Sequence, residues 1–380
     1  MDKKICVIVI GGGYFGSSIA YHLAARNVRT TLIEKGELGD GSSGANFGNI
    51  QVQDAEAGIS LQMALESFSL WKEMKKLLDM DIEYKSHGSL ILATSQEEWD
   101  YLREIQSLKL KQGLKVSFLN SSQIKNIEPC LSTDYVYGAS FNVEASINPF
   151  KLIFALARRA RDMGAAIMEN TNVEDFIIEQ NEIKGVTTNC GHIKADLVIL
   201  TTGAWTKQIC KRLNLNIPVE YVYAEAFVTE TLPLVLNNSI SLASFFTEAH
   251  GKKDSVSSLC CTQNLSGNIL IGETTHPGDN KEVLNTRLRK SSNNHFSRIP
   301  IEIKKYFPKL LDCKVIRSWC TASPYTAQHR PVFGFVGPKG LFVASGFKST
   351  VIMLPIVGQI VADIITKGKN FYNLKDISII

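Results

Sequence analysis

The stretch that decides the fold is ICVIVIGGGYFG, residues 5–16. Its first half is a continuous apolar run, which is typical of a central parallel strand buried on both faces. Its second half fits G-x-G-x-x-G with Gly11, Gly13 and Gly16, and from Ile19 onward apolar residues follow at helical spacing. This order predicts a strand, a glycine turn and a helix.

Each glycine has a physical reason to be there. Gly11 turns the chain, Gly13 lets the backbone approach a pyrophosphate, and Gly16 lets the helix and the strand pack closely. The next strand, residues 29–34, ends in Glu34, whose carboxylate is placed to accept hydrogen bonds from ribose hydroxyls. The unit therefore predicts a bound dinucleotide. The glycine motif fits FAD and NAD alike, and a purely structural turn is the alternative.

Bulk composition favours small-molecule chemistry. The chain has 380 residues with 44% hydrophobic and 21% charged content, which suits two domains with a sizeable core. Its 41 Lys+Arg against 37 Asp+Glu give a net charge of +4. That balance is too mild to predict a nucleic acid or an anionic membrane surface as a partner.

Cysteines and apolar segments predict a cytoplasmic protein without a transmembrane segment. The eight cysteines form no C-x-x-C pair and no ligand-spaced cluster with the histidines, so no metal site is predicted. The first strand begins at Ile5, which leaves no room for a signal peptide, so we expect a reducing compartment. The apolar stretch 351–365 contains Pro355 and Asp363 and is shorter than the ~20 residues of a membrane span, which predicts a buried helix.

A second segment, SSGANFGNIQ at residues 42–51, resembles the loop that passes beside the flavin ring in D-amino-acid-oxidase-like flavoenzymes. This resemblance implies FAD as the cofactor. The ANFG version, followed by Gln51 and Gln53, looks most like the flavin subunits of proline dehydrogenase, hydrogen cyanide synthase and opine oxidase complexes. Further similarities follow in family order at Asn148-Pro149 and at TTGAW, residues 201–205.

The resemblance implies a Rossmann-like FAD-binding domain of the glutathione-reductase type with an interleaved α+β substrate domain built on a mixed sheet. We expect the FAD-binding domain at residues 1–80, 149–210 and 315–380, and the substrate domain at 81–148 and 211–314. The residues expected to hold noncovalent FAD are Gly11, Gly13, Tyr14, Phe15, Gly16, Glu34, Lys35, Ser42, Ser43, Asn46, Phe47, Gly48, Asn49, Val173, Thr202, Gly203, Trp205, Gly346, Phe347, Lys348, Ser349 and Thr350.

In enzymes that this chain resembles, the α C–H bond of an amine delivers hydride to flavin N5, and water hydrolyses the resulting imine. Many relatives clamp a substrate carboxylate with an arginine where this chain has Ser323, which cannot form the bidentate fork. Relatives also have Thr-Pro-Asp where this chain has Thr-Ala-Gln at residues 326–328. Lys348 and Arg330 are the candidates to supply the positive charge, with a solvated surface role as the alternative for each. The resemblance places Lys348 at the pyrimidine edge of the flavin.

Three more predictions concern the substrate side. Alternation places Tyr221, Tyr223 and Glu225 on one face of a strand, where cavity lining and ordinary sheet packing both fit, and Tyr223 is the catalytic candidate. Cys320 is offset by one residue from the position at which some relatives attach FAD. Because that offset turns the side chain to the other face, we expect noncovalent FAD. The histidines at 250 and 276 are expected in solvated loops.

The resemblance leaves three functions open. The first is a dehydrogenase subunit that oxidises an amino acid, imino acid or amine and passes electrons to a partner subunit. The second is a stand-alone oxidase that produces hydrogen peroxide. The third is a flavin-binding subunit with little catalysis of its own, which the departures at Ser323 and Gln328 keep open.

Overall fold

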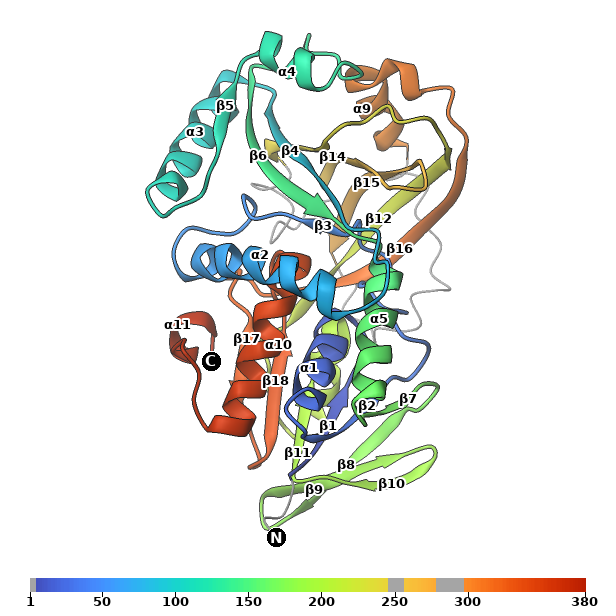
Figure 1. The fold of residues 1–380 in the computed structure, drawn as a ribbon, viewed down its shortest axis with the longest axis vertical. Coiled ribbons are helices and arrows are strands. Elements are labelled where there is room, and N and C mark those ends of the chain that lie inside the picture. The colour runs from blue at the N-terminus through green and yellow to red at the C-terminus, as the bar shows by residue number, and fades with distance from the viewer. Residues whose placement is uncertain (1–4, 245–255, 278–296) are drawn as a thin grey trace.

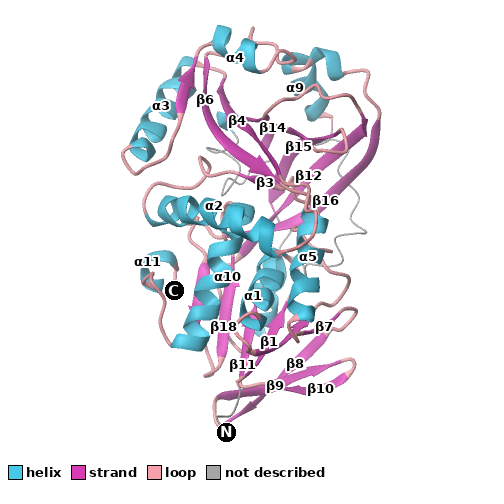
Figure 2. Ribbon diagram, viewed as in Figure 1, coloured by secondary structure: helices cyan, strands magenta, loops and turns pink. Residues whose placement is uncertain are grey.

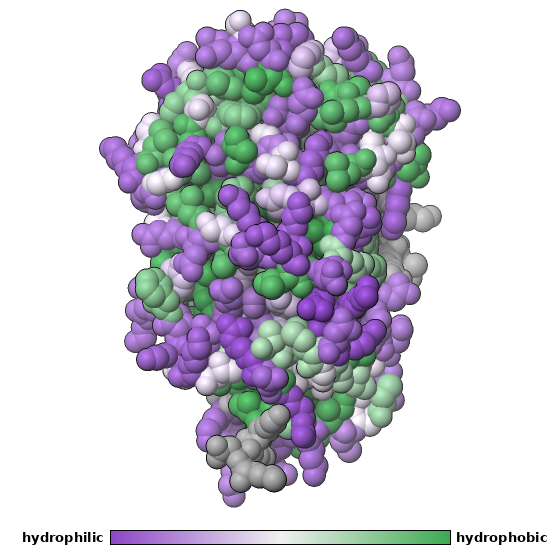
Figure 3. Space-filling model, in the orientation of Figure 1, coloured by the Kyte–Doolittle hydropathy of each residue, from purple (hydrophilic) through white to green (hydrophobic). Residues whose placement is uncertain are grey.

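The computed structural model describes residues 5–244, 256–277 and 297–380. Figure 1 shows an elongated molecule in which the glycine-turn unit and its helices occupy one half and a large twisted sheet occupies the other. On the face drawn in Figure 3, hydrophilic and hydrophobic side chains are interspersed, in keeping with the mild net charge of +4.

A six-stranded sheet with the order β17-β18-β11-β1-β2-β7 forms the first half. β1 pairs in parallel with both β2 and β11, and β17 is the antiparallel edge strand. This confirms the predicted Rossmann-like sheet, in which β1 is a central parallel strand. The strands span, in sheet order, Val332–Phe335, Leu341–Ser345, Leu197–Leu200, Cys6–Ile10, Arg29–Ile33 and Ala166–Met168.

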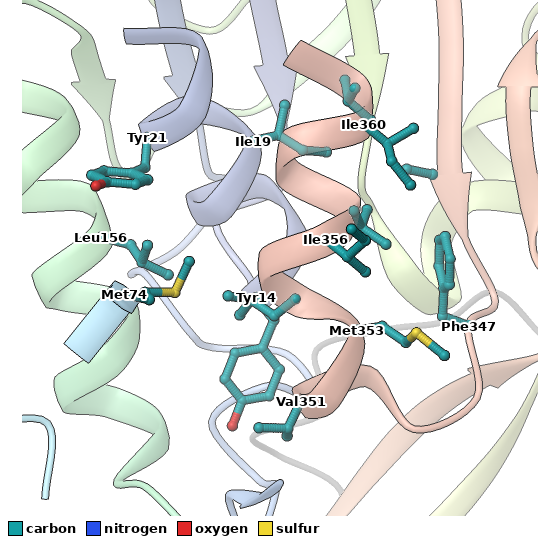
Figure 4. Close-up of a cluster of buried hydrophobic side chains, with 14 of the residues drawn as sticks. Tyr14, Ile19, Tyr21, Met74, Leu156, Phe347, Val351, Met353, Ile356 and Ile360 are labelled. Atoms are coloured by element: carbon teal, nitrogen blue, oxygen red, sulfur yellow. The ribbon is translucent and has the colours of Figure 1, made fainter. Parts of the chain in front are cut away.

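The core of this half lies between the sheet and helices α1 (Tyr14–Ala24), α5 (Pro149–Asp162) and α10 (Thr350–Lys367). Figure 4 shows side chains of these three helices meeting in one apolar cluster. Among the described helices, α10 is the one long and apolar enough to cross a membrane by length and composition. Its place in this core accounts for that apolar sequence, as predicted for residues 351–365.

A nine-stranded mixed sheet forms the second half, with the order β16-β12-β15-β14-β13-β4-β6-β3 and with β5 paired to β6. Most neighbours are antiparallel, and β13 and β4 are parallel. The strands span, in that order, Val315–Tyr325, Glu220–Thr231, Asn268–Pro277, Val256–Gln263, Ser239–Leu242, Lys85–Ala93, Gly138–Ser146, Asn49–Ile50 and Ser117–Leu119.

Shorter elements complete the two halves (Figure 2). A three-stranded antiparallel sheet, β10-β9-β8, lies beside the nucleotide sheet and spans Gly191–Lys194, Glu182–Thr188 and Val173–Glu179. The remaining helices are α2 (Ile59–Leu77), α3 (Gln96–Leu110), α4 (Ser121–Ile127), η1 (Gly203–Trp205), α6 (Thr206–Lys211), α9 (Arg298–Tyr306), η3 (Pro308–Leu310) and α11 (Leu374–Ile377).

We expected the FAD-binding domain to resume near residue 315, but the strand that begins there belongs to the nine-stranded sheet. β16 pairs along its length with β12 and therefore belongs to the nine-stranded sheet, whereas the nucleotide sheet takes its next strand at Val332. The short strand β3 also leaves the first segment to join β6. The reason is physical: an apolar alternating segment shows that a strand forms but not which sheet edge it completes.

Candidate active site

One cavity lies where the two large sheets meet. It is lined from one side by the glycine turn and from the other by strands of the nine-stranded sheet. Residues from segments far apart in the sequence therefore share one space. The expected cofactor residues that line it are Gly13, Tyr14, Phe15, Ser42, Ser43, Asn46, Phe47, Asn49, Gly203, Gly346, Phe347, Lys348, Ser349 and Thr350.

The glycine turn is too tight for side chains. A Cβ atom on Gly16 would lie 1.8 Å from the carbonyl oxygen of Gly11, and one on Gly11, whose φ is +108°, would lie 2.6 Å from the carbonyl oxygen of Thr201. A Cβ on Gly13 would point at Ser43 Oγ, 2.8 Å away. Helix α1 starts at Gly13 without a side-chain cap or an acidic first turn. Such a helix start suits a phosphate group.

Glu34, at the end of β2, lies beside the segment that leads to Val173. The Glu34 carboxylate accepts hydrogen bonds from Gly12 N at 2.7 Å and from Gly36 N at 3.0 Å. Its backbone carbonyl accepts from Thr171 N at 2.9 Å, which brings the segment before Val173 alongside. This arrangement fits an adenosine group, with the carboxylate beside the ribose.

Lys35 and Trp205, both expected cofactor residues, contact each other. The Lys35 ammonium lies 3.6 Å from the centre of the Trp205 ring, and burial lowers the pKa of Lys35. Beside them, Thr202 Oγ1 bonds Thr206 Oγ1 at 3.0 Å. Glu34, Lys35, Val173, Thr202 and Trp205 are not among the cavity-lining residues, and neither are Gly11, Gly16 and Gly48.

The loop of residues 42–49 is anchored on both halves. Tyr14 N donates to Ser43 Oγ at 3.0 Å at the glycine turn. Gly48 N donates to Asn46 Oδ1 at 2.7 Å, and Ser239 of β13 donates to Asn49 Oδ1 at 3.2 Å. The loop thus passes across the cavity from the nucleotide sheet to the nine-stranded sheet.

The segment before α10 closes the cavity. Phe347 packs against Phe15 with ring centres 4.7 Å apart. Ser349 has a left-handed φ of 54° and donates a hydrogen bond to Asp54. Lys348 lines the cavity, and its ammonium lies 3.2 Å from Glu56 Oε1. Its expected place at the pyrimidine edge of the flavin stays a prediction.

The structure corrects the assignment of Tyr223. Ala224 and Ala226 line the cavity together with Thr321 of β16, so the alternate residues of β12 face away from it. Tyr221 and Tyr223 do share one face, with ring centres 5.3 Å apart, but Tyr223 packs with Cys320 and Ala322 behind the cavity wall. The alternation of side chains along the strand predicted that Tyr221 and Tyr223 share one face of β12. It did not predict whether that face points toward the cavity or away from it.

That rear face carries a buried polar group. The His276 ring nitrogen lies 3.6 Å from Glu225 Oε1, and ligand atoms of Glu225, His276 and Cys320 lie within 4.8 Å of one another. His276 belongs to strand β15 and not to a loop as expected, because β15 extends beyond the predicted apolar run. His250 lies outside the described residues.

Arg330 is placed away from the cavity. Its guanidinium group donates to the carbonyl oxygens of Lys375 at 2.7 Å and of Ser378 at 2.6 Å, so it fastens the C-terminal segment to the loop before β17. Arg330 is exposed and does not line the cavity. The prediction of Arg330 as a catalytic residue is therefore wrong. Its long side chain binds backbone carbonyls that lie 45 and 48 residues further along the chain and come near only in the folded protein.

Two acids in the cavity were missed by sequence reasoning. Asp54 follows the predicted loop, and its Oδ1 is buried with no hydrogen-bond partner in the part of the chain that the structure describes. Glu273 on β15 also lines the cavity, and burial raises its pKa to about 7. A lone acid in a mostly apolar strand was the available signal for Glu273, since such a residue is rarely buried without a reason.

The comparisons with known proteins agree with this geometry. Residues 6–364 match the family described as DAO, FAD dependent oxidoreductase. The chain belongs to this family. It is therefore an FAD-dependent oxidoreductase, as predicted, and the tight glycine turn beside Glu34 fits that cofactor.

Members of the DAO family similar to this chain include both oxidases and dehydrogenases. Glycine oxidase of Bacillus subtilis (strain 168) is 28% identical, with 96% of this chain and 94% of that protein covered. The crystal structure of L-proline dehydrogenase from P. horikoshii is 28% identical with a TM-score of 0.85, covering 99% of this chain and 96% of that one. Hydrogen cyanide synthase subunit HcnC of Pseudomonas aeruginosa is 23% identical, covering 96% and 92%.

Proposed function

We propose that this DAO-family enzyme oxidises the C–N bond of an amino acid, imino acid or related secondary amine. The observation that carries the proposal is the shared cavity. Predicted flavin-side residues such as Phe47 and Phe347 form one wall, and the small side chains of Ala224 and Ala226 leave room opposite them. When bound, FAD supplies a two-electron acceptor for the α C–H bond of the amine.

The chain's own residues would orient the substrate and limit water. Phe47 and Trp319 meet edge to face with ring centres 6.3 Å apart, and Trp319 Nε1 donates to the Ala45 carbonyl at 3.1 Å. This contact ties the loop to β16 and gives the cavity an apolar side. Lys348 would stabilise negative charge that develops during the reaction, since such interactions are stronger in a water-poor site.

For the electron acceptor, we favour a dehydrogenase subunit that passes electrons to a partner subunit. Support comes from the similarity to L-proline dehydrogenase and to hydrogen cyanide synthase subunit HcnC. A stand-alone oxidase that produces hydrogen peroxide is the second candidate, and the similarity to glycine oxidase favours it. We also propose a cytoplasmic location, which the free state of all eight cysteines supports.

Anaerobic mixing of the purified holoenzyme with proline, sarcosine, glycine, D-amino acids, opines and simple amines tests the proposed reaction. We expect at least one class to bleach the flavin absorbance. No bleaching by any of them would favour a flavin-binding subunit with little catalysis. For a substrate that bleaches, rapid oxygen consumption would identify the oxidase, and slow reoxidation by oxygen with fast reoxidation by an artificial acceptor would identify the dehydrogenase.

A further inference from the structure

The substrate side of the cavity carries an acid and few positive charges. Ser323 of β16 lines the cavity, and its hydroxyl cannot form a bidentate pair with a carboxylate. Of the lysines and arginines that the structure describes, Lys348 is the one that lines it, and its ammonium lies 3.2 Å from Glu56 Oε1. A substrate carboxylate thus meets no bidentate partner among the described lining residues.

Glu273 reaches the cavity because β15 has a bulge at this residue. Glu225 of β12 pairs with Thr274 and Ala226 pairs with Gly272, so Glu273 is the extra residue between them. A bulge re-aims a side chain and is over-represented beside active sites. The bulge also lies against the flavin-side loop, since a Cβ on Gly272 would be 3.0 Å from Phe47 Cζ.

The surroundings of the Glu273 carboxyl suit a cation. No described residue forms a hydrogen bond or an ion pair with it, and burial raises its pKa to about 7. Ser241 and Cys260 line the same cavity and cannot carry a positive charge, and burial raises the pKa of Cys260 to about 12, so its thiol is neutral. A bound cation would stabilise the ionised carboxylate.

Aromatic rings stand near this acid. Phe47 approaches the bulge at Gly272, and Trp319 pairs in register with Ala226, which neighbours the same bulge. Both rings line the cavity. Aromatic faces and a carboxylate together form the usual surroundings of an alkylammonium group in proteins.

We infer that the substrate of this site is a cationic amine without a carboxylate, whose ammonium group is bound by the carboxylate of Glu273. This inference rests on the proposed C–N oxidation and names its substrate class. Asp54, whose buried Oδ1 has no hydrogen-bond partner among the described residues, adds a second carboxyl group to the same cavity. The carboxyl groups of Glu273 and Asp54 would favour an ammonium group on this side of the cavity.

Ligand binding to the oxidised holoenzyme tests this without turnover. Tetramethylammonium and acetate are titrated separately while the flavin absorbance spectrum is recorded, with Glu273→Gln and Glu220→Gln compared to the unchanged protein. Glu220 lies on β12 of the same sheet and pairs with Lys207 outside the cavity, so it serves as the matched control. We expect tetramethylammonium to bind more tightly than acetate, and Glu273→Gln to weaken its binding about tenfold to a hundredfold.

The outcomes separate the two proposals. The inference is overturned if acetate binds more tightly than tetramethylammonium. It is also overturned if tetramethylammonium binds equally to Glu273→Gln and to Glu220→Gln. Amino acids could still bleach the flavin in that case, and the proposed C–N oxidation would stand. Selective cation binding that depends on Glu273, without bleaching by any amine, would instead leave the binding assignment and remove the oxidation.

Discussion

Lys348 is the lysine that lines the cavity within the described part of the chain, and its ammonium lies 3.2 Å from Glu56 Oε1. Its side chain is 17% exposed against 48% for its partner Glu56, so it is the less solvated member of the pair. Its charge should therefore act on whatever negative charge the reduced flavin develops.

We predict that Lys348→Met lowers the two-electron reduction potential of the bound flavin. A lost interaction of roughly 1–3 kcal/mol corresponds to about 20–60 mV for a two-electron couple. Glu56→Gln should shift the potential upward, because it removes the acid beside Lys348 and leaves its charge in place. Reductive titration measures both. If the unchanged protein and both variants have equal potentials with FAD still bound, Lys348 does not act on the flavin and this prediction is wrong.

Tyr223 and Arg330 show what single residues do not reveal in a sequence. Alternation correctly grouped Tyr223 with Tyr221, but the direction of the group depends on how β12 lies against β16 and the cavity. Arg330 bonds the carbonyl oxygens of Lys375 and Ser378, which folding brings near it. The orientation of Tyr223 and the partners of Arg330 both depend on tertiary contacts, which a local sequence pattern cannot predict.

At the scale of elements, the segment between β3 and α2 is held by a buried acid and a buried base. Glu144 of β6 accepts hydrogen bonds from Val52 N at 2.7 Å and Gln53 N at 2.8 Å. Lys109 of α3 donates to the Gln53 carbonyl at 2.8 Å. These contacts fix the backbone that carries Asp54 into the cavity. From the sequence alone, nothing indicates that Glu144 and Lys109 bind this segment, because both are distant from it along the chain.

Glu144 should make stability depend on pH. Burial raises its pKa from 4.5 to about 7, so ionisation destabilises the fold, and the stability it contributes is present below pH 4.5 and is lost as pH rises through about 7. The full effect is on the order of 3 kcal/mol. We predict that Glu144→Gln removes this loss. Denaturant unfolding at pH 5 and pH 8 measures it, and a parallel pH dependence in both proteins would contradict the assignment.

The orientation of Cys320 on strand β16 bears on whether FAD is attached covalently. Cys320 pairs with Glu225 on the rear face, whereas its neighbours Trp319 and Thr321 line the cavity. The predicted one-residue offset therefore does turn the thiol away from the flavin side. We predict that acid or heat releases all FAD from the chain. A denatured band that keeps flavin fluorescence on an electrophoresis gel would show a covalent bond and contradict this.

At the scale of the whole molecule, the sequence predicts the nucleotide half better than the substrate half. The βαβ unit is local, because strand, turn, helix and strand follow within one short stretch, and β1, α1 and β2 lie where predicted. The nine-stranded sheet instead joins strands from distant segments, including β3 and β16 from segments expected in the other domain. Glu273 enters the cavity through that long-range pairing, which explains why it was missed.

We expect the glycine turn and the cavity beside it to hold FAD. The most direct measurement is the ratio of flavin to protein in the purified chain and in Gly13→Val, with Gly334→Val as the control. A Cβ on Gly13 would lie 2.8 Å from Ser43 Oγ, whereas one on Gly334 meets no atom within 4 Å. We predict close to one FAD per chain in the unchanged protein and in Gly334→Val, and none in a folded Gly13→Val. A flavin-free unchanged protein, or full FAD content in Gly13→Val, would contradict the account.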